Sequence, residues 1–252
     1  MALLELRDVK KRFGNLIALD KIDLDVHPGE VVGIVGPNGS GKTTLLNVIS
    51  GYHRPSEGTI SYEGQKIAGL RPDKIAALGI VRTFQQNIIY WDAVILENVI
   101  RACYLANRTN LWQSFFNSRS YVAEEAGIRE KAVDIVKTFG LADYMYSPAP
   151  GLPHGKQRSL SMAMALAANP VLLLLDEPLA GMDAAETELV AGNIKKIIER
   201  GVTIMLVEHN IKSVLRLCNR IIVLDFGLKI ADGKPEEVLK SQNVVEAYLG
   251  VD

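Results

Sequence analysis

The segment with the clearest chemical pattern is Gly36-Pro37-Asn38-Gly39-Ser40-Gly41-Lys42-Thr43, followed by Thr44. It matches the phosphate-binding pattern G-x-x-x-x-G-K-[ST]. The glycines allow backbone N–H groups to turn toward anionic oxygens. Lys42 adds a positive charge for the terminal phosphates, and the Thr43 hydroxyl can reach Mg²⁺. A helix expected over Lys42–Ser50 points its positive end at the same phosphates. The segment therefore predicts a nucleoside-triphosphate site.

Two carboxylates end an apolar run later in the chain. Leu172–Leu175 are followed directly by Asp176 and Glu177. At the carboxyl edge of a parallel sheet, Asp176 can hold Mg²⁺ or its water, and Glu177 can polarise an attacking water molecule. A strand end that is merely solvated is the alternative, but the phosphate loop in the same chain favours the catalytic interpretation.

The hydrophobic pattern predicts the elements that must position these residues. Continuous apolar runs of strand length indicate strands buried on both faces, and such runs separated by helical stretches are typical of a mostly parallel α/β sheet. Near the N-terminus, apolar and polar residues alternate at Leu4 and Leu6 and again over Ile22–Val26, which predicts half-exposed antiparallel strands. The continuous runs are Val31–Val35, Val171–Leu175, Thr203–Val207 and Ile221–Leu224.

The central part of the chain has helical patterning. Apolar residues between Ile128 and Phe139 recur on one helical face, and Gly140 is a candidate for the helix cap. Pro148–Gly151 should break any helix. A further helix is expected from about Ser159 to Ala168.

The expected architecture is therefore one α/β domain over residues 1–252. Residues 1–85 and 170–252 form the core, with its mostly parallel sheet and an N-terminal antiparallel β subdomain. Residues 86–169 form an inserted α-helical subdomain.

The composition disfavours several classes of protein. Lys and Arg total 28 and Asp and Glu total 29, whereas domains that mainly bind nucleic acid carry a strong basic excess. No apolar run approaches the roughly 18–20 residues of a membrane span, and the charged N-terminus lacks the apolar region of a signal peptide. We expect a soluble, cytoplasmic protein without nucleic-acid partners, in which Cys103 and Cys218 are buried thiols.

With these motifs in this order, the chain resembles the ATP-binding cassette (ABC) family over essentially its whole length. The resemblance implies a P-loop ATPase fold with ATP and Mg²⁺ as cofactors. Four further segments match family motifs: Lys11-Arg12-Phe13-Gly14, Thr83-Phe84-Gln85, Ala180-Gly181-Met182-Asp183 and Leu206-Val207-Glu208-His209.

The resemblance also assigns roles to single residues. Phe13 would stack on adenine, with Ala18 packed nearby, and the phosphate loop would hold the phosphates. Gln85 would touch Mg²⁺ and the attacking water, and His209 would contact the γ-phosphate. The implied catalytic residues are Glu177, His209, Gln85 and Lys42, and the implied Mg²⁺ ligands are Thr43, Gln85 and Asp176.

The family's signature, usually Leu-Ser-Gly-Gly-Gln, departs from its pattern here. The corresponding segment is Leu152-Pro153-His154-Gly155-Lys156, which keeps only Leu152 and Gly155. In the family this segment, together with the loop that contains Asp183, acts on the nucleotide of a second cassette. Pro153 removes a serine hydroxyl and a backbone N–H, while Lys156 adds a charge that can partly replace them. A weakened but working signature and an inert one paired with a normal partner both remain open, as do a homodimer and a heterodimer.

Other segments resemble the ATPase subunits of branched-chain amino-acid importers. These are Arg82–Gln85, Leu96-Glu97-Asn98-Val99, an extra segment at Leu111–Phe116, and Ala247-Tyr248-Leu249-Gly250. The resemblance implies an ATPase at the cytoplasmic face of a membrane, bound to permease subunits and served indirectly by a solute-binding protein. Residues 87–91 would line the groove for a membrane subunit. Residues 104–121 mix aromatic and basic side chains. A helical hairpin on the domain or a contact with a membrane subunit is favoured there over a surface that stacks on nucleic-acid bases.

Three alternatives differ in function. Within the family, the chain could serve urea or amide uptake or lipopolysaccharide-type export. A soluble cassette ATPase of DNA repair or translation is disfavoured because the chain has one phosphate loop and no sustained heptads. A regulatory module without hydrolysis is disfavoured by Asp176, Glu177 and His209, all of which are present.

Overall fold

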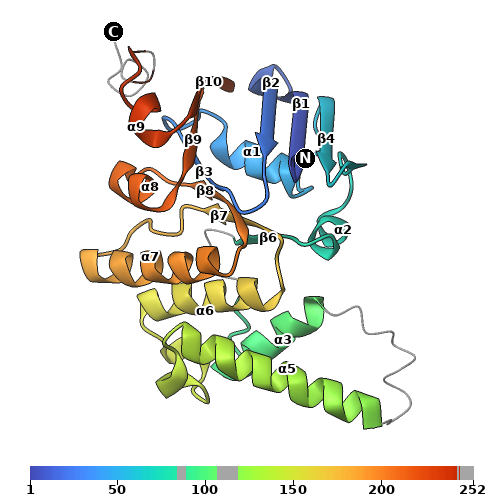
Figure 1. The fold of residues 1–252 in the computed structure, drawn as a ribbon, viewed down its shortest axis with the longest axis vertical. Coiled ribbons are helices and arrows are strands. Elements are labelled where there is room, and N and C mark those ends of the chain that lie inside the picture. The colour runs from blue at the N-terminus through green and yellow to red at the C-terminus, as the bar shows by residue number, and fades with distance from the viewer. Residues whose placement is uncertain (84–88, 107–118, 243, 245–252) are drawn as a thin grey trace.

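Two sheets and a group of helices make up the fold (Figure 1), seen in a computed structural model that describes residues 1–83, 89–106, 119–242 and 244. The strands are β1 (Leu4–Phe13), β2 (Leu16–Val26), β3 (Val31–Val35), β4 (Glu57–Tyr62), β5 (Gln65–Lys66), β6 (Ile80–Thr83), β7 (Leu172–Asp176), β8 (Thr203–Val207), β9 (Arg220–Asp225) and β10 (Leu228–Gly233). The helices are α1 (Lys42–Ile49), α2 (Pro72–Ala77), α3 (Ile95–Ala106), α5 (Arg119–Thr138), α6 (His154–Ala167), α7 (Ala184–Glu199), α8 (Ile211–Leu217) and α9 (Pro235–Val238), with 3₁₀ turns at Ala142–Tyr144 and Ala149–Gly151. Figure 1 shows α3, α5 and α6 gathered at the end away from β1, β2 and β4.

The N-terminal strands form the antiparallel sheet that the alternating pattern predicts. The strand order is β2-β1-β4-β5, and Leu4 and Leu6 of β1 pair with Val26 and Leu24 of β2. These four side chains are buried, which confirms the prediction. The turn between β1 and β2 places Phe13 at the end of this hairpin.

The second sheet has six described strands in the order β10-β9-β3-β8-β7-β6. All neighbouring pairs are parallel except β9 and β10, which confirms the prediction of a mostly parallel sheet. β3 and β8 have the expected bounds. β7 begins one residue later than expected, at Leu172, and Val171, which precedes the buried run, is 43% exposed.

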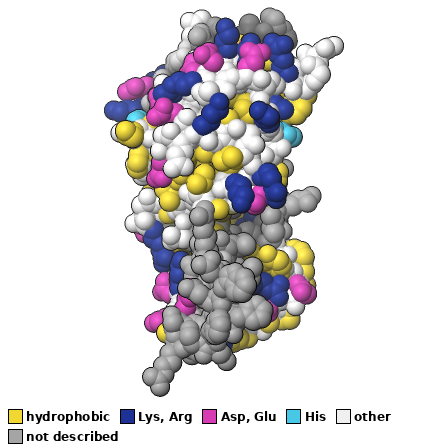
Figure 2. Space-filling view, turned by 90° about the vertical axis from the view of Figure 1, so that its right-hand side faces the viewer, with side chains coloured by type: hydrophobic (Ala, Val, Ile, Leu, Met, Phe, Trp, Pro, Cys, Tyr) yellow, Lys and Arg dark blue, Asp and Glu magenta, His cyan; other side chains and the backbone are white. Residues whose placement is uncertain are grey.

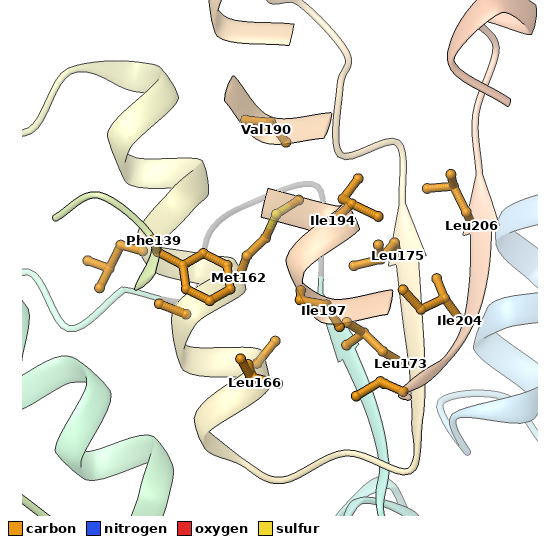
Figure 3. Close-up of a cluster of buried hydrophobic side chains, with 14 of the residues drawn as sticks. Phe139, Met162, Leu166, Leu173, Leu175, Val190, Ile194, Ile197, Ile204 and Leu206 are labelled. Atoms are coloured by element: carbon orange, nitrogen blue, oxygen red, sulfur yellow. The ribbon is translucent and has the colours of Figure 1, made fainter. Parts of the chain in front are cut away.

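Both faces of the sheet are buried at its central strands β3, β7 and β8, as the continuous apolar runs indicated. Leu173 and Leu175 face a core shared with α6 and α7, where they lie near Ile194 and Ile197 (Figure 3). Leu172 and Leu174 belong to the other core, between the two sheets. Because the sheet packs against a hydrophobic core on each face, the carboxyl ends of its strands are held in fixed positions. Those ends carry the candidate catalytic residues.

In the helical region, α5 agrees with the helix expected from the sequence, whereas α6 begins earlier than expected. The predicted apolar face from Ile128 to Phe139 is buried, and α5 ends at Thr138, close to the expected cap at Gly140. The prolines over 148–151 end the α-helical pattern, yet they allow one 3₁₀ turn at Ala149–Gly151.

The prediction that the next helix begins at about Ser159 is wrong, because α6 begins at His154. The backbone N–H groups of Lys156 and Gln157 donate to the Pro153 carbonyl oxygen, so the first turn forms directly after this proline. Its residues are polar, and an apolar period cannot reveal such a turn. His154, Gly155 and Lys156 of the altered signature therefore lie in the first turn of α6.

Both cysteines lie in the interior of the protein. Cys103 and Cys218 are both buried, as expected, and burial raises the pKa of Cys218 to about 12. Basic and acidic side chains are interspersed on the face in Figure 2. Within the described ranges, no helix is both long enough and apolar enough to cross a lipid bilayer. Gln85 and the segment Leu111–Phe116 lie outside the described residues.

Candidate active site

A cavity of about 440 Å³ lies beside the loop that joins β3 to α1. It brings together residues that are distant in the sequence: the end of the first hairpin, the phosphate loop and the end of β7. The lining residues are Phe13, Leu16, Ile17, Ala18, Asn38, Gly39, Gly41, Lys42, Thr43, Thr44, Glu177 and Phe226.

Gly36 and Pro37 of the phosphate loop do not line the cavity, but they position residues that do. Gly36 has φ 148°, and a Cβ atom there would overlap the carbonyl oxygen of Leu224, so only glycine fits. The Lys42 ammonium donates to the carbonyl oxygens of Gly36 and Pro37, at 2.9 and 2.8 Å. Burial lowers the pKa of Lys42, while the negative charges of Glu177 and Asp176 oppose that shift. The loop thus holds the Lys42 ammonium in place at a cavity that Lys42 itself lines.

Glu177 and His209 meet at the edge of the sheet. The carboxylate oxygen Oε1 of Glu177 lies 2.7 Å from Nε2 of His209, which donates in the tautomer that carries its proton there. They follow neighbouring parallel strands, because Asp176 of β7 pairs with Val207 of β8. Glu177 has φ 47°, a conformation that costs a non-glycine residue free energy and is common where a side chain must be aimed. The structure therefore places a carboxylate beside a histidine at the cavity.

Asp176 is suited to hold a magnesium ion. Its Oδ2 atom accepts a hydrogen bond of 2.9 Å from the Arg82 guanidinium, while its Oδ1 atom is buried with no hydrogen-bond partner in the described part of the chain. Thr43 supplies a hydroxyl at the cavity. Mg²⁺ is usually bound by one or two such oxygens together with substrate phosphates. These residues fit Mg²⁺.

Arg82 joins this carboxylate to α1. The same guanidinium donates to Asn47 Oδ1 at 2.6 Å and to Ser50 Oγ at 3.2 Å. The side chains of Arg82 and Asp176 are only 5% and 3% exposed. The ion pair is therefore shielded from water, and each charge depends on the other.

Glu208 connects two loops near the site. Its carboxylate accepts hydrogen bonds from the backbone N–H of Leu179, at 2.9 Å, and of His209, at 3.2 Å. Burial raises the pKa of Glu208, and these backbone donors oppose that shift. One buried side chain thus positions both the segment after Glu177 and the backbone of His209.

The altered signature lies away from the cavity of its own chain. None of Leu152–Lys156 is among the cavity-lining residues. Pro153 and His154 are exposed at the start of α6, whereas Leu152 is buried. The Lys156 ammonium donates to the carbonyl oxygen of Gly140, at 2.9 Å, just beyond the end of α5. In this chain, therefore, the Lys156 charge is held by the helical region.

Asp183 and Gly155 are linked through α7. Asp183 caps this helix, since its side chain accepts a hydrogen bond of 2.8 Å from the N–H of Glu186. The Glu186 side chain accepts another, of 2.9 Å, from the N–H of Gly155. The start of α6 and the start of α7 are thereby held together.

Comparison with known proteins identifies the family. A family model described as ABC transporter matches residues 19–180. The chain belongs to the ABC transporter family. A second model, described as branched-chain amino acid ATP-binding cassette transporter, matches residues 229–252 of the cassette.

Three relatives illustrate the similarity. The cassette is 33% identical to the high-affinity branched-chain amino acid transport ATP-binding protein LivG of Escherichia coli, over 98% of each chain. It is 30% identical, with a TM-score of 0.85 and full coverage of both chains, to the crystal structure of the ADP conformation of MJ1267, an ATP-binding cassette of an ABC transporter. It is 29% identical, with a TM-score of 0.76, to the ATP-binding cassette MJ0796, in a dimeric post-hydrolysis structure bound to ADP and Pi; the match covers 92% of this chain and 98% of that one.

Several residues at the cassette's site carry no motif that assigns them a role from the sequence. Leu16, Ile17 and Phe226 line the cavity, and Arg82 and Glu208 position other site residues. Arg82 and Glu208 lie within the motifs Arg82–Gln85 and Leu206–His209, but the motifs gave neither of them a role. An aromatic residue directly before Gly227, after a predicted strand, was the available signal for Phe226.

Proposed function

We propose that this ATPase cassette powers a membrane importer of branched-chain or other hydrophobic amino acids, working at the cytoplasmic face. The observation that carries the catalytic part is the 2.7 Å contact between Glu177 and His209 at the phosphate-loop cavity. The match of residues 229–252 to the branched-chain amino acid model and the full-length similarity to LivG support the transported class.

The site residues divide the chemistry between them. Lys42 and the phosphate loop bind the triphosphate, and Phe13 with Ala18 receives the base. Asp176, Thr43 and Gln85 would hold Mg²⁺, which when bound neutralises charge on the phosphates. Glu177 accepts the proton of the attacking water, and His209 contacts the γ-phosphate. Positioning and charge stabilisation supply most of the catalysis in phosphoryl transfer.

The proposed assembly contains two cassettes and membrane permease subunits. Leu152–Lys156 and Asp183 would complete the nucleotide site of the second cassette, which agrees with their position away from the cavity of their own chain. Exposed Tyr90 and Trp91 belong to the segment proposed to face a permease subunit. A solute-binding protein would select the amino acid.

The mass of the Glu177→Gln variant in solution tests whether the cassette pairs with itself. We expect 27.6 kDa without ATP and twice that, 55.2 kDa, with saturating ATP, because hydrolysis no longer separates the pair. Light scattering coupled to size exclusion gives the mass. The Lys42→Ala variant, which lacks the phosphate-binding charge, is the control and should stay at 27.6 kDa. A monomer at saturating ATP would contradict the homodimer and would favour a partner that supplies the donors absent at Pro153.

Uptake by cells that lack the gene tests the proposed substrate class. We expect uptake of radiolabelled leucine to fall several-fold and to recover with a plasmid copy of wild type but not of Lys42→Ala. Urea uptake in the same strains should not change. A loss of urea uptake with normal leucine uptake would favour the urea or amide alternative. If uptake of both leucine and urea were unchanged and the cells had a defect in their outer-surface lipopolysaccharide, the lipopolysaccharide-type export alternative would be favoured.

A further inference from the structure

The cavity has an apolar end that the phosphate loop does not explain. Leu16, Ile17 and Phe226 line it together with Phe13 and Ala18. We propose that Phe226 forms a second aromatic wall of the nucleobase site, in addition to Phe13. This inference rests on the proposed nucleotide site and assigns part of it to the turn between β9 and β10.

Phe226 is unusual in both exposure and backbone conformation. Its side chain is 86% exposed, more than any other large hydrophobic side chain in the described ranges except Met1. Its φ of 43° lies in the left-handed region, where bulky residues are rare and glycine or asparagine is favoured. Neither feature helps the free chain to fold. Strained residues and exposed aromatic side chains at a cavity are both typical of ligand contacts.

The turn that carries Phe226 is attached to the phosphate loop and to β2. The N–H of Gly227 donates to the carbonyl oxygen of Ser40 at 3.1 Å, and the N–H of Asp20 donates to the carbonyl oxygen of Gly227 at 2.8 Å. Gly227 has φ 79°, and a Cβ atom there would lie 2.9 Å from the carbonyl oxygen of Ala18. The backbone of this turn is thus fixed beside Ala18, and it holds Phe226 at the edge of the cavity that the residue lines.

The chemistry of the lining indicates how a base would be held. The charged lining residues are Lys42 and Glu177, which belong to the phosphate loop and the end of β7. The residues from the two hairpins, Phe13, Leu16, Ile17, Ala18 and Phe226, carry no polar side-chain atoms. Such a surface recognises the flat face of a heteroaromatic ring by stacking and apolar contact. Phe226 would therefore add affinity for the base and none for the phosphates.

Calorimetric titration with two probes separates these contributions. The probes are the non-hydrolysable ATP analogue AMP-PNP, which has a base, and inorganic tripolyphosphate, which has none. We expect Phe226→Ala to raise the dissociation constant of AMP-PNP about tenfold and to leave that of tripolyphosphate unchanged. Phe226→Tyr should restore wild-type affinity. Leu228→Ala is the matched control, because Leu228 is exposed in the same hairpin but does not line the cavity.

A second variant distinguishes the loss of a base contact from a folding defect. Phe226→Gly should melt no lower than wild type, because glycine adopts φ 43° without strain, yet it should lose the same affinity for AMP-PNP. If Phe226→Ala bound AMP-PNP with wild-type affinity, the inference about Phe226 would be overturned and the proposed function would stand. Equal loss for both probes would also overturn it, because Phe226 would then act through the phosphate loop. If the wild-type chain bound neither probe, the nucleotide site itself would fail.

Discussion

Replacing Glu177 by glutamine is expected to leave ATP binding intact and to lower the rate of ATP hydrolysis by about a hundredfold or more. The amide keeps the size of the carboxylate and can still hydrogen-bond to His209, which lies 2.7 Å from Glu177 Oε1. It cannot accept a proton from water at neutral pH. The measurements are phosphate release under saturating ATP and the dissociation constant of ATP.

The control for this variant is Glu188→Gln, which removes the same charge from an exposed position on α7. Its turnover should equal that of wild type. Near-normal turnover of Glu177→Gln would remove Glu177 from the role of base. A loss of ATP binding in that variant would show that the side chain acts on the ground state instead of the reaction step.

Replacing Arg82 by methionine is expected to lower the free energy of unfolding by about 3–5 kcal/mol. The variant leaves Asp176 buried without its counter-charge and removes the donor to Asn47 and Ser50. Both side chains of the pair are at most 5% exposed, so water cannot replace the lost partner. Urea unfolding followed by circular dichroism gives the free energy.

Two further variants show whether the lost charge is the cause. Arg216→Met breaks an ion pair with Glu188 whose side chains are 51% and 63% exposed, and its unfolding should match that of wild type. The double variant Arg82→Met with Asp176→Leu removes both buried charges and should recover much of the lost stability. If Arg82→Met unfolded at the wild-type urea concentration, the pair would contribute nothing to stability.

Local patterns predicted the parts of the fold that depend on neighbouring residues. The phosphate loop, the strands Val31–Val35 and Thr203–Val207, and the buried face of α5 depend on residue types at short spacing. The polar first turn of α6 gave no apolar signal, so its start was placed too late.

Contacts between distant segments could not be predicted in this way. Arg82 and Asp176 are 94 positions apart, and their pairing depends on β6 lying next to β7. The position of Phe226 depends on the β9–β10 turn packing against the phosphate loop. In both cases the tertiary arrangement creates the contact, whereas the residue types alone allow many partners.

The four consecutive leucines of β7 leave its alignment with β6 undetermined by hydrophobicity. If β7 slipped by one residue, Leu172 and Leu174 would enter the core that now holds Leu173 and Leu175, and the reverse. Each core would still receive two leucine side chains. Arg82 pairs with Leu174, and Asp176 follows two residues later on the same face. A slipped strand would turn Asp176 to the opposite core and leave two buried charges apart. We therefore expect this ion pair to select one strand alignment among alternatives that the leucines would accept equally.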